Sequence, residues 1–360
     1  MATLILGTYP SAGLGTPVGQ GEGLWRADWD GDGIVAARQV TTEQAPSFVV
    51  THPHLPLAYA VEEADVTALA VWSLEDSPVE VARVTVGGSF GCHVLLAADA
   101  RALYVCNYGS GELAVVRLGA DGLPKSDTPD QFLPHAGSGP REDRQEGPHA
   151  HFAALSPGGT HVIVCDLGTD EVRRYALGDD GLLGECGIAA TLPPGSGPRH
   201  LAVRGELLYL VCELDHQVRT LRWDRETATA LVIAEQPTTL CSQRTGDTVY
   251  DAHVQVVPHQ GGDVLLISVR GADVISVFDV APEGELTYRA AFDAGYWPRH
   301  FAVVGESLVV GAEKGHELRV YGLDDVLSLA PESESGACAV LDFRVAPVTS
   351  PACIAAVDPR

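Results

Sequence analysis

The chain has 360 residues, 46% of them apolar, and is therefore long enough to bury an extensive core. Its 48 acidic and 23 basic residues give a formal net charge of −25 at pH 7, and a surface with this charge repels the phosphates of nucleic acids. No apolar run reaches membrane-spanning length, and no basic segment followed by an apolar one stands at the start, so neither a membrane span nor a signal peptide is expected.

The first predicted strand runs from Thr3 to Tyr9. Residues 28–33, with the sequence Asp-Trp-Asp-Gly-Asp-Gly, then begin like a calcium-binding loop. The twelfth position of that loop is Gln39, where calcium binding requires a bidentate glutamate. We therefore predict a hairpin turn in this segment.

From residue 46 onward, a strand-turn-strand unit recurs six times, and each copy has polar residues at its open ends. The first strands start at Ser47, Cys92, His151, Arg199, Ala252 with His253, and Arg299. The second strands end at Glu62, Asn107, Asp166, Glu213, Arg270 and Glu313. Successive copies start about 45 to 59 residues apart, which is the period of a four-stranded propeller blade.

Two features inside the repeats have a structural interpretation. Residues 87–91 match the Gly-x-Ser-x-Gly pattern of a nucleophile elbow, but a strand rather than a helix follows them, so no nucleophile is assigned there. Cys106, Cys165 and Cys212 occupy the same place in three successive repeats. We interpret them as small buried apolar residues in a reducing compartment, with disulfides as the alternative, and expect a cytoplasmic location.

The remaining segments complete the predicted fold. Residues 121–148 are the longest polar insertion and form a candidate lid carrying Arg144, and residues 324–329 predict one helical turn. The last predicted strand, 352–357, supplies the first strand of a seventh repeat, and the N-terminal strand supplies its second. The prediction is an all-β, seven-bladed β-propeller closed by pairing of the N- and C-terminal strands, in a single domain spanning residues 1–360.

The polar ends of the repeats predict a binding site. In each blade the first strand and the second are antiparallel, so the start of one and the end of the other lie at the same mouth of the channel. The cationic and imidazole side chains expected at this mouth are Arg199, Arg270, Arg299, His149 and His151. Gathered in a strongly acidic protein, they predict a focused site for an anion.

Metal and cofactor sites are not expected. His149 and His151, with His93 and Glu213, are residue types that ligate metals, but no His-Glu-x-x-His motif or paired Cys/His spacing accompanies them. The chain also contains neither a phosphate-binding P-loop nor a dinucleotide-binding glycine motif. A monomer or a weak homo-oligomer is expected.

Six motifs give the chain a family resemblance. They are Leu6-Gly7-Thr8-Tyr9, Cys106-Asn107-Tyr108-Gly109-Ser110-Gly111, Arg144-Gln145-x-x-Pro148-His149-x-His151, Asp166-Leu167-Gly168-Thr169-Asp170, Gly195-Ser196-Gly197-Pro198-Arg199-His200 and Pro298-Arg299-His300-Phe301. With them the chain resembles the seven-bladed propeller lactonases, specifically the propeller-type 6-phosphogluconolactonases, over nearly its whole length. The resemblance implies hydrolysis of 6-phosphoglucono-1,5-lactone to 6-phosphogluconate in the pentose phosphate pathway.

A fungal carboxymuconate-lactonizing cycloisomerase is similar too, and its His, Arg, Glu and Arg set falls here on His151, Arg199, Glu213 and Arg270. The chain departs from the family pattern in the sixth repeat. There Ala252-His253-Val254-Gln255 replaces Ala-Glu-Ile-His, and Ser268-Val269-Arg270-Gly271 replaces Ser-Asn-Arg-Gly.

The residue types suit lactone hydrolysis, which needs an activated water, a cation near the developing oxyanion and a grip on an anionic group of the substrate. The candidate base is His151 or its neighbour His149, because an imidazole titrates near neutral pH, with Glu213 as orienting group or alternative base. The residues predicted to bind the substrate anion are Arg199, Arg270, Arg299, Arg144 and Asn107. Another lactonase, a dicarboxylate cycloisomerase and a non-catalytic propeller scaffold remain open as alternatives.

Overall fold

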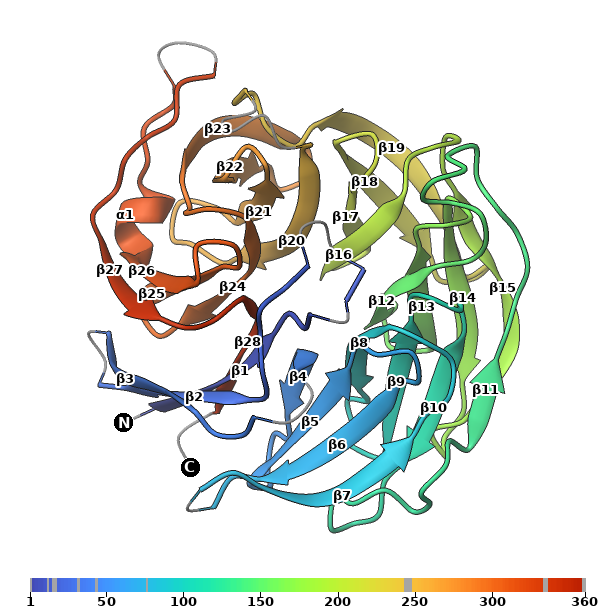
Figure 1. The fold of residues 1–360 in the computed structure, drawn as a ribbon. Helices are drawn as coiled ribbons and strands as arrows, with labels where there is room; N and C mark the ends of the chain where they lie inside the picture. Colours follow the sequence, from blue (N-terminus) through green and yellow to red (C-terminus); the bar gives the residue numbers. More distant parts are fainter. Residues whose placement is uncertain are drawn as a thin grey trace.

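The computed structural model describes residues 2–11, 13–14, 18–30, 33–42, 45–75, 77–242, 248–332 and 336–357. In this part of the chain, seven four-stranded antiparallel sheets surround a central axis like the blades of a propeller (Figure 1). The innermost strand of each sheet contacts the innermost strands of both neighbouring sheets, so the ring is closed. The predicted all-β, seven-bladed architecture is confirmed.

The blades follow one another around the ring in chain order, and the strands of each blade run from the channel outward. From the innermost strand to the outermost they are β28 (Pro351–Val357), β1 (Ala2–Thr8), β2 (Trp25–Trp29) and β3 (Ile34–Gln39); β4 (Pro46–Thr51), β5 (Leu57–Glu62), β6 (Ala68–Ser73) and β7 (Val79–Thr85); β8 (Gly91–Leu96), β9 (Ala102–Asn107), β10 (Leu113–Arg117) and β11 (Gln131–Leu133); β12 (Ala150–Leu155), β13 (His161–Asp166), β14 (Glu171–Leu177) and β15 (Leu183–Thr191); β16 (Pro198–Arg204), β17 (Leu207–Cys212), β18 (Gln217–Asp224) and β19 (Thr229–Pro237); β20 (Tyr250–Val257), β21 (Val264–Arg270), β22 (Val274–Val280) and β23 (Leu286–Asp293); and β24 (Pro298–Val304), β25 (Ser307–Ala312), β26 (Glu317–Gly322) and β27 (Phe343–Pro347).

The second strand of each blade carries the longest apolar run because both of its faces are covered by neighbouring blades. Every residue of β17, with the sequence Leu-Leu-Tyr-Leu-Val-Cys, is buried. The outermost strand β7 instead alternates exposed and partly buried side chains, since only one of its faces packs on the core. Cys106, Cys165 and Cys212 are buried at matched places in their second strands, as the sequence predicts.

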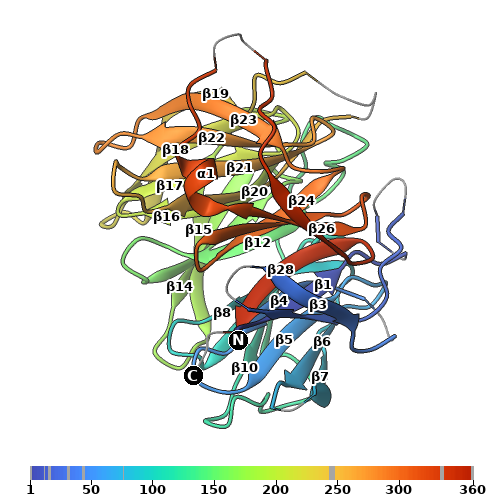
Figure 2. The same cartoon turned by 90° about the vertical axis from the view of Figure 1, so that its left-hand side faces the viewer.

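The ring closes where the two ends of the chain meet. Strand β1 pairs antiparallel with β28, and Gly7 lies opposite Cys353, as predicted (Figure 2). A Cβ atom on Gly7 would lie 2.6 Å from the carbonyl oxygen of Pro46 in the next blade, so only glycine fits this close approach.

Neighbouring blades are also joined by a repeated tyrosine contact. In three second strands, a buried tyrosine hydroxyl donates a hydrogen bond to a glycine carbonyl in the outer turn of the next blade. The pairs are Tyr59 with Gly122 at 2.9 Å, Tyr104 with Gly181 at 3.0 Å and Tyr209 with Gly284 at 3.2 Å. Each of these glycines has a positive φ, so the turn and the contact depend on the same residue.

The other local predictions can be placed as well. The short helix α1 (Leu323–Leu327) occupies the predicted helical turn. Strands β2 and β3 form the predicted hairpin, although residues 31 and 32 of its turn lie outside the described residues. The insertion 121–148 is not loop throughout, because it contains the short strand β11. No described helix has the length and apolar character needed to cross a membrane.

Candidate active site

A β-bulge recurs at the same place in the innermost strands and aims side chains into one end of the channel. In β12, for example, the pairing with β13 shifts between Ala150 and Phe152, so that His151 is the extra residue. The residues displaced in this way are Ser47, Cys92, His151, Arg199, Ala252 with His253, and Arg299. They are the first-strand start positions that the sequence repeats predict at the mouth.

A cavity of about 780 Å³ opens at this end of the channel. The polar and aromatic residues that line it are Tyr9, Glu63, Phe90, Cys92, Tyr108, Asp143, Arg144, Glu146, His149, His151, Arg199, Glu213, Thr248, Tyr250, Arg270, Trp297, Arg299, Glu313 and Lys314. All of the predicted catalytic residues and every predicted arginine are among them. Asn107 is not.

Glu213 is the centre of the charged cluster in this cavity. Its Oε1 accepts a hydrogen bond from Arg144 at 2.6 Å, and its Oε2 accepts one from Arg199 at 2.8 Å and one from Arg270 at 2.7 Å. Three guanidinium groups thus surround one carboxylate, which leaves this wall of the cavity with surplus positive charge.

The electrostatics of this cluster follow from burial and from the number of arginines. Burial would by itself raise the pKa of Glu213, but Arg270, Arg144 and Arg199 together hold that pKa well below its usual range. Burial and the neighbouring Arg270 lower the pKa of Arg199 to about 9. At neutral pH all four groups are therefore charged, and Glu213 is too stabilised as a carboxylate to serve readily as a base.

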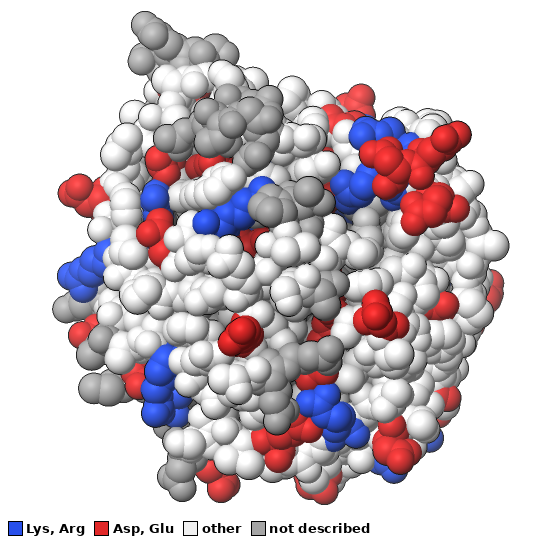
Figure 3. Space-filling model, viewed as in Figure 1, with Lys and Arg blue, Asp and Glu red and all other residues white. Residues whose placement is uncertain are grey.

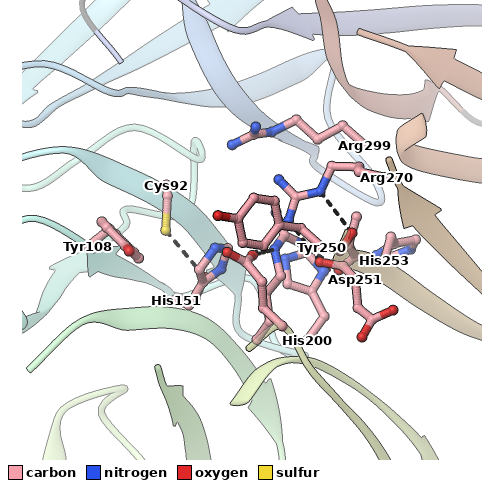
Figure 4. Close-up of polar contacts among 12 residues, drawn as sticks. Cys92, Tyr108, His151, His200, Tyr250, Asp251, His253, Arg270 and Arg299 are labelled. Atoms are coloured by element: carbon pink, nitrogen blue, oxygen red, sulfur yellow. Dashed lines mark hydrogen bonds and ion pairs between the residues drawn. The ribbon is translucent and has the colours of Figure 1, made fainter. Parts of the chain in front are cut away.

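The arginines are held in place by backbone carbonyls and aromatic rings. Arg270 donates to the carbonyl oxygen of Asp251 at 2.8 Å, and its guanidinium carbon lies 5.6 Å from the ring centroids of both Tyr250 and Trp297. Arg199 donates to the carbonyl oxygen of Ala252. In Figure 4, Arg270 extends from one side of the cavity and His151 and Cys92 from the other.

Arg299 belongs to a second charged group in the same cavity. It donates to Glu313 Oε2 at 3.0 Å and stacks on the ring of Tyr9, with its guanidinium carbon 3.8 Å from the ring centroid. The hydroxyl of Tyr9 donates to Glu63 Oε1 at 3.0 Å. Here one guanidinium pairs with Glu313 and also acts on Glu63 through its charge, so carboxyl groups outnumber arginines in this group, unlike at Glu213.

The two candidate bases are oriented differently. The ring of His149 stacks on Tyr108, and its Nδ1 donates to the Tyr108 carbonyl oxygen at 2.6 Å, which leaves Nε2 at 3.3 Å from Glu146. His151 is 7% exposed, and its buried Nδ1 has no hydrogen-bond partner. Burial and the nearby Arg199 hold the pKa of His151 well below its usual range, so the expectation of a base titrating near neutrality is wrong for this residue.

Below the bulge residues, a ring of aromatic side chains closes the channel. Each member directly follows a displaced residue or is displaced itself, and the order around the channel is Phe48, His93, Phe152, His200, His253 and His300. Burial lowers the pKa of all four histidines, to about 3 for His93 and His300. This uncharged layer lies next to the bulge residues, and none of its six members is among the residues that line the cavity.

Three of the residues predicted at the ends of the second strands do not line the cavity. Asn107 is buried outside the cavity, Glu62 pairs with Arg83 at 2.8 Å, and Asp166 accepts hydrogen bonds from three backbone amides and contacts His135. The sheet register explains the error. Glu62 and Asn107 lie directly opposite Pro46 and Gly91, whereas Glu213 follows the residue opposite Pro198 by one position.

Because side chains alternate along a strand, the residues equivalent to Glu213 and Glu313 are one position later, at Glu63 and Tyr108. Both line the cavity, and both were missed in the sequence. Spacing alone could not identify them. Glu213 and Glu313 follow the bulge arginine of their blade by 14 residues, whereas Glu63 and Tyr108 follow Ser47 and Cys92 by 16.

The candidate lid is anchored at the residue beside Arg144. The buried Gln145 donates to the carbonyl oxygen of Leu167 at 2.9 Å and to Asp170 at 2.8 Å, which fixes the loop to the neighbouring blade. Arg144 thereby reaches Glu213 across blade boundaries and also contacts the Tyr108 hydroxyl at 3.3 Å.

The structure forms no metal site from the residues considered as ligands, which are His149, His151, His93 and Glu213. Among the described residues, no group of three or more His, Cys, Asp or Glu side chains is arranged to hold a metal ion. On the end of the propeller seen in Figure 3, basic side chains are scattered among acidic ones, and the described part shows no broad basic patch there. The concentrated positive charge lies in the cavity.

Comparisons with known proteins agree with this arrangement. A family model described as "Lactonase, 7-bladed beta-propeller" matches residues 3–334. The 6-phosphogluconolactonase of Bacillus subtilis (strain 168) is 31% identical over 267 residues, which are 71% of this chain and 73% of that protein.

Two solved structures share the fold. The periplasmic gluconolactonase PpgL of Pseudomonas aeruginosa superposes with a TM-score of 0.81 at 23% identity, over 99% of each chain. A protein of Lactobacillus plantarum superposes with a TM-score of 0.78 at 25% identity, over 99% of this chain and 100% of that one. With the family match over most of its length and its closed ring of seven blades, the chain belongs to the seven-bladed β-propeller lactonase family.

Proposed function

We propose that this lactonase hydrolyses a sugar lactone bearing an anionic group, and specifically that it is a 6-phosphogluconolactonase converting 6-phosphoglucono-1,5-lactone to 6-phosphogluconate. The observation that carries the proposal is the surplus of positive charge around Glu213, where three arginines meet one carboxylate inside the cavity. A phosphate is a strong ligand for such an arginine cluster. The name of the Bacillus subtilis relative points to the same substrate.

In the proposed mechanism, His151 accepts a proton from the water that attacks the lactone carbonyl. The ring is uncharged over the whole neutral range because its pKa is lowered, so it keeps a lone pair for the proton. Arg199 and Arg270 lie on the same cavity wall, where they bind the anionic group or stabilise the oxyanion that develops as water adds. Glu213 holds these guanidinium groups in position.

Bound substrate also adjusts the base. The anionic group of the substrate offsets part of the positive charge that lowers the pKa of His151, and this raises the proton affinity of the imidazole when the lactone is present. The site therefore becomes more basic on binding. A lactone without the anionic group gives a smaller effect.

The proposal is tested with a matched pair of substrates, 6-phosphoglucono-1,5-lactone and glucono-1,5-lactone. Arg144→Gln removes one guanidinium from the cluster without touching a strand, and Arg141→Gln, on the exposed part of the same loop, is the control. We expect kcat/KM for the phosphorylated lactone to fall about 10- to 150-fold, from the loss of about 1.5–3 kcal/mol of charge-assisted hydrogen bonding, and to change far less for glucono-1,5-lactone.

Acid release is measured in chelator-treated buffer against spontaneous hydrolysis. Equal losses on both lactones would assign Arg144 to the carbonyl rather than to the phosphate, and a wild-type preference for glucono-1,5-lactone would favour an unphosphorylated substrate. If the wild-type protein hydrolyses neither lactone, the proposed function is refuted. If the chelator abolishes the activity, the metal-free mechanism is refuted. A cytoplasmic location and a role in the pentose phosphate pathway complete the proposal.

A further inference from the structure

Glu63 is a carboxyl group that the mechanism above does not use. It follows β5 directly, lines the cavity and is 4% exposed. Its Oε1 accepts the hydrogen bond from Tyr9, but its buried Oε2 has no hydrogen-bond partner. A buried oxygen left in this state is costly unless it has a task or a ligand.

The charges that face Glu63 favour its protonated form. Burial raises the pKa of Glu63, and the charge of Arg299 and the hydroxyl groups of Ser47 and Tyr9 offset this only in part. Cys92 and Tyr9 also face this carboxyl, and the pKa of both is raised by burial, so they are uncharged neighbours. Glu313 adds a negative charge that further disfavours a second carboxylate.

The pKa values of the two carboxyl groups at equivalent blade positions are therefore shifted in opposite directions. Glu213 and Glu63 each follow the end of a second strand, yet Glu213 contacts three arginines and Glu63 contacts Tyr9. Paired carboxyl groups whose surroundings drive their pKa values apart are a common arrangement in acid-base catalysis. One serves as the fixed anion and the other as the proton donor.

We propose that Glu63 is the general acid of the lactonase site, the residue that protonates the ring oxygen of the lactone as the acyl–oxygen bond breaks. This inference rests on the proposed lactone hydrolysis. Its unpartnered Oε2, enclosed in the cavity, is the atom that delivers the proton, and Tyr9 holds the other oxygen.

The step balances in atoms and charge. Water adds to the carbonyl carbon and gives one proton to His151; when the tetrahedral intermediate collapses, the electron pair of the acyl–oxygen bond goes to the ring oxygen, which takes the proton of Glu63. The products are the hydroxyl group and the carboxylic acid. The proton on His151 then returns to the Glu63 carboxylate through solvent, and one water has been consumed.

The experiment compares Glu63→Gln with Glu62→Gln. The two residues are adjacent and buried to a similar extent, but Glu62 pairs with Arg83 outside the cavity, so the same chemical change is made on and off the site. The substrates are 6-phosphoglucono-1,5-lactone, whose leaving group is an alkoxide, and dihydrocoumarin, whose phenolate leaves without prior protonation. The readouts are kcat, KM and the pH profile.

For Glu63→Gln we expect kcat on the sugar lactone to fall by about 10²- to 10⁴-fold with little change in KM. The alkaline limb of the wild-type kcat/KM profile, which reports deprotonation of Glu63, should disappear in the variant. The rate on dihydrocoumarin should change by less than about threefold, and Glu62→Gln should behave as wild type on both substrates.

Equal losses on both lactones with the alkaline limb retained would overturn the inference and assign Glu63 a structural role, as would wild-type kinetics of Glu63→Gln. If the wild-type protein hydrolyses neither lactone, the proposed function itself fails. Folding of each variant is checked by its melting temperature. If Glu63→Gln does not fold, Tyr9→Phe, which frees Oε1 and keeps the carboxyl, should shift the alkaline limb, and an unshifted limb would contradict the inference.

Discussion

His151 and His149 enter the cavity two residues apart, but their ring nitrogens are held in different ways. The carbonyl oxygen of Tyr108 fixes the tautomer of His149, whereas His151 is buried beside Arg199 with an unpartnered Nδ1. We favour His151 as the base because it is the bulge residue, in the same position as Arg199 and Arg299 in their blades. His149 lies nearer the rim, beside Glu146.

This assignment predicts an unusual pH dependence. A base acts when unprotonated, so kcat/KM falls as the pH drops through its pKa in the free enzyme. Because the pKa of His151 is held well below its ordinary value of 6.5, we expect the acid limb of the profile to lie well below pH 6.5. His151→Ala should lower kcat by about a hundredfold or more and abolish that limb.

His149→Ala is the companion variant, assayed on the same lactone over the same pH range. If His149→Ala loses the acid limb and His151→Ala keeps it, the roles are exchanged. If both variants keep full activity, a histidine base is wrong for this site.

At the level of single residues, the sequence predicts the cations better than the carboxyl groups. Arg199 and Arg299 follow Gly-Pro or Trp-Pro in nearly identical segments, so their equivalence is visible without a structure. Glu63 was hidden because Glu62 precedes it and both are acidic. Only the strand register, which depends on hairpin length, shows which of the two side chains faces the cavity.

At the level of the strand, the recurring bulge explains how one fold position supplies both the site and the aromatic ring. In β4, β8, β12, β16 and β24 the bulge turns one residue toward the mouth and the next residue lies in the aromatic ring, whereas in β20 the displaced His253 itself lies in the ring. A regular strand would place these two side chains on opposite faces of the sheet. Bulges leave little trace in a single sequence, so the repeat could be predicted but the ring of histidines could not.

The histidine ring predicts acid sensitivity of the fold. An unfolded histidine takes up a proton near pH 6.5, but His93 and His300 in the folded protein do so only near pH 3, so the unfolded state binds more protons between these values. The contribution of these histidines to the free energy of unfolding is therefore fully present above pH 6.5 and declines as the pH falls below that value. Each such histidine contributes a slope of up to about 1.4 kcal/mol per pH unit.

His93→Phe tests this contribution with a residue that the ring already contains, since Phe48 and Phe152 occupy the equivalent places on either side. The free energy of unfolding, measured by chemical denaturation from pH 6.5 to 5, should fall less steeply with acid in the variant by up to about 1.4 kcal/mol per pH unit. Parallel curves for wild type and variant would show that the pKa of His93 is not lowered in the folded protein.

At the level of the whole molecule, the ring was predictable because the six repeats left one unpaired strand at each end of the chain. The closure places Ala352, Cys353 and Ile354 in the buried centre of the propeller. The aromatic composition of the channel and the contact of Arg144 with Glu213 depend on how distant blades meet, and spacing along one chain does not encode that geometry directly.

Removing β28 should therefore abolish the cooperative fold. A chain lacking residues 350–360 should aggregate or melt far below the full-length protein, because β1 would lose its inner partner and expose an unpaired edge. A chain lacking only residues 358–360, which lie beyond β28, is the control. A soluble 350–360 deletion with an unchanged melting temperature would contradict closure by this strand.

The pairing of β1 with β28 also ties folding to the order of synthesis. Strand β1 leaves the ribosome roughly 340 residues before β28, the strand with which it pairs. At about 5–20 residues per second, β1 waits roughly 17 to 70 seconds for its inner neighbour. During that interval the inner edge of β1 is open to other nascent chains, so the need for chaperones is concentrated at this strand and ends when β28 pairs with it.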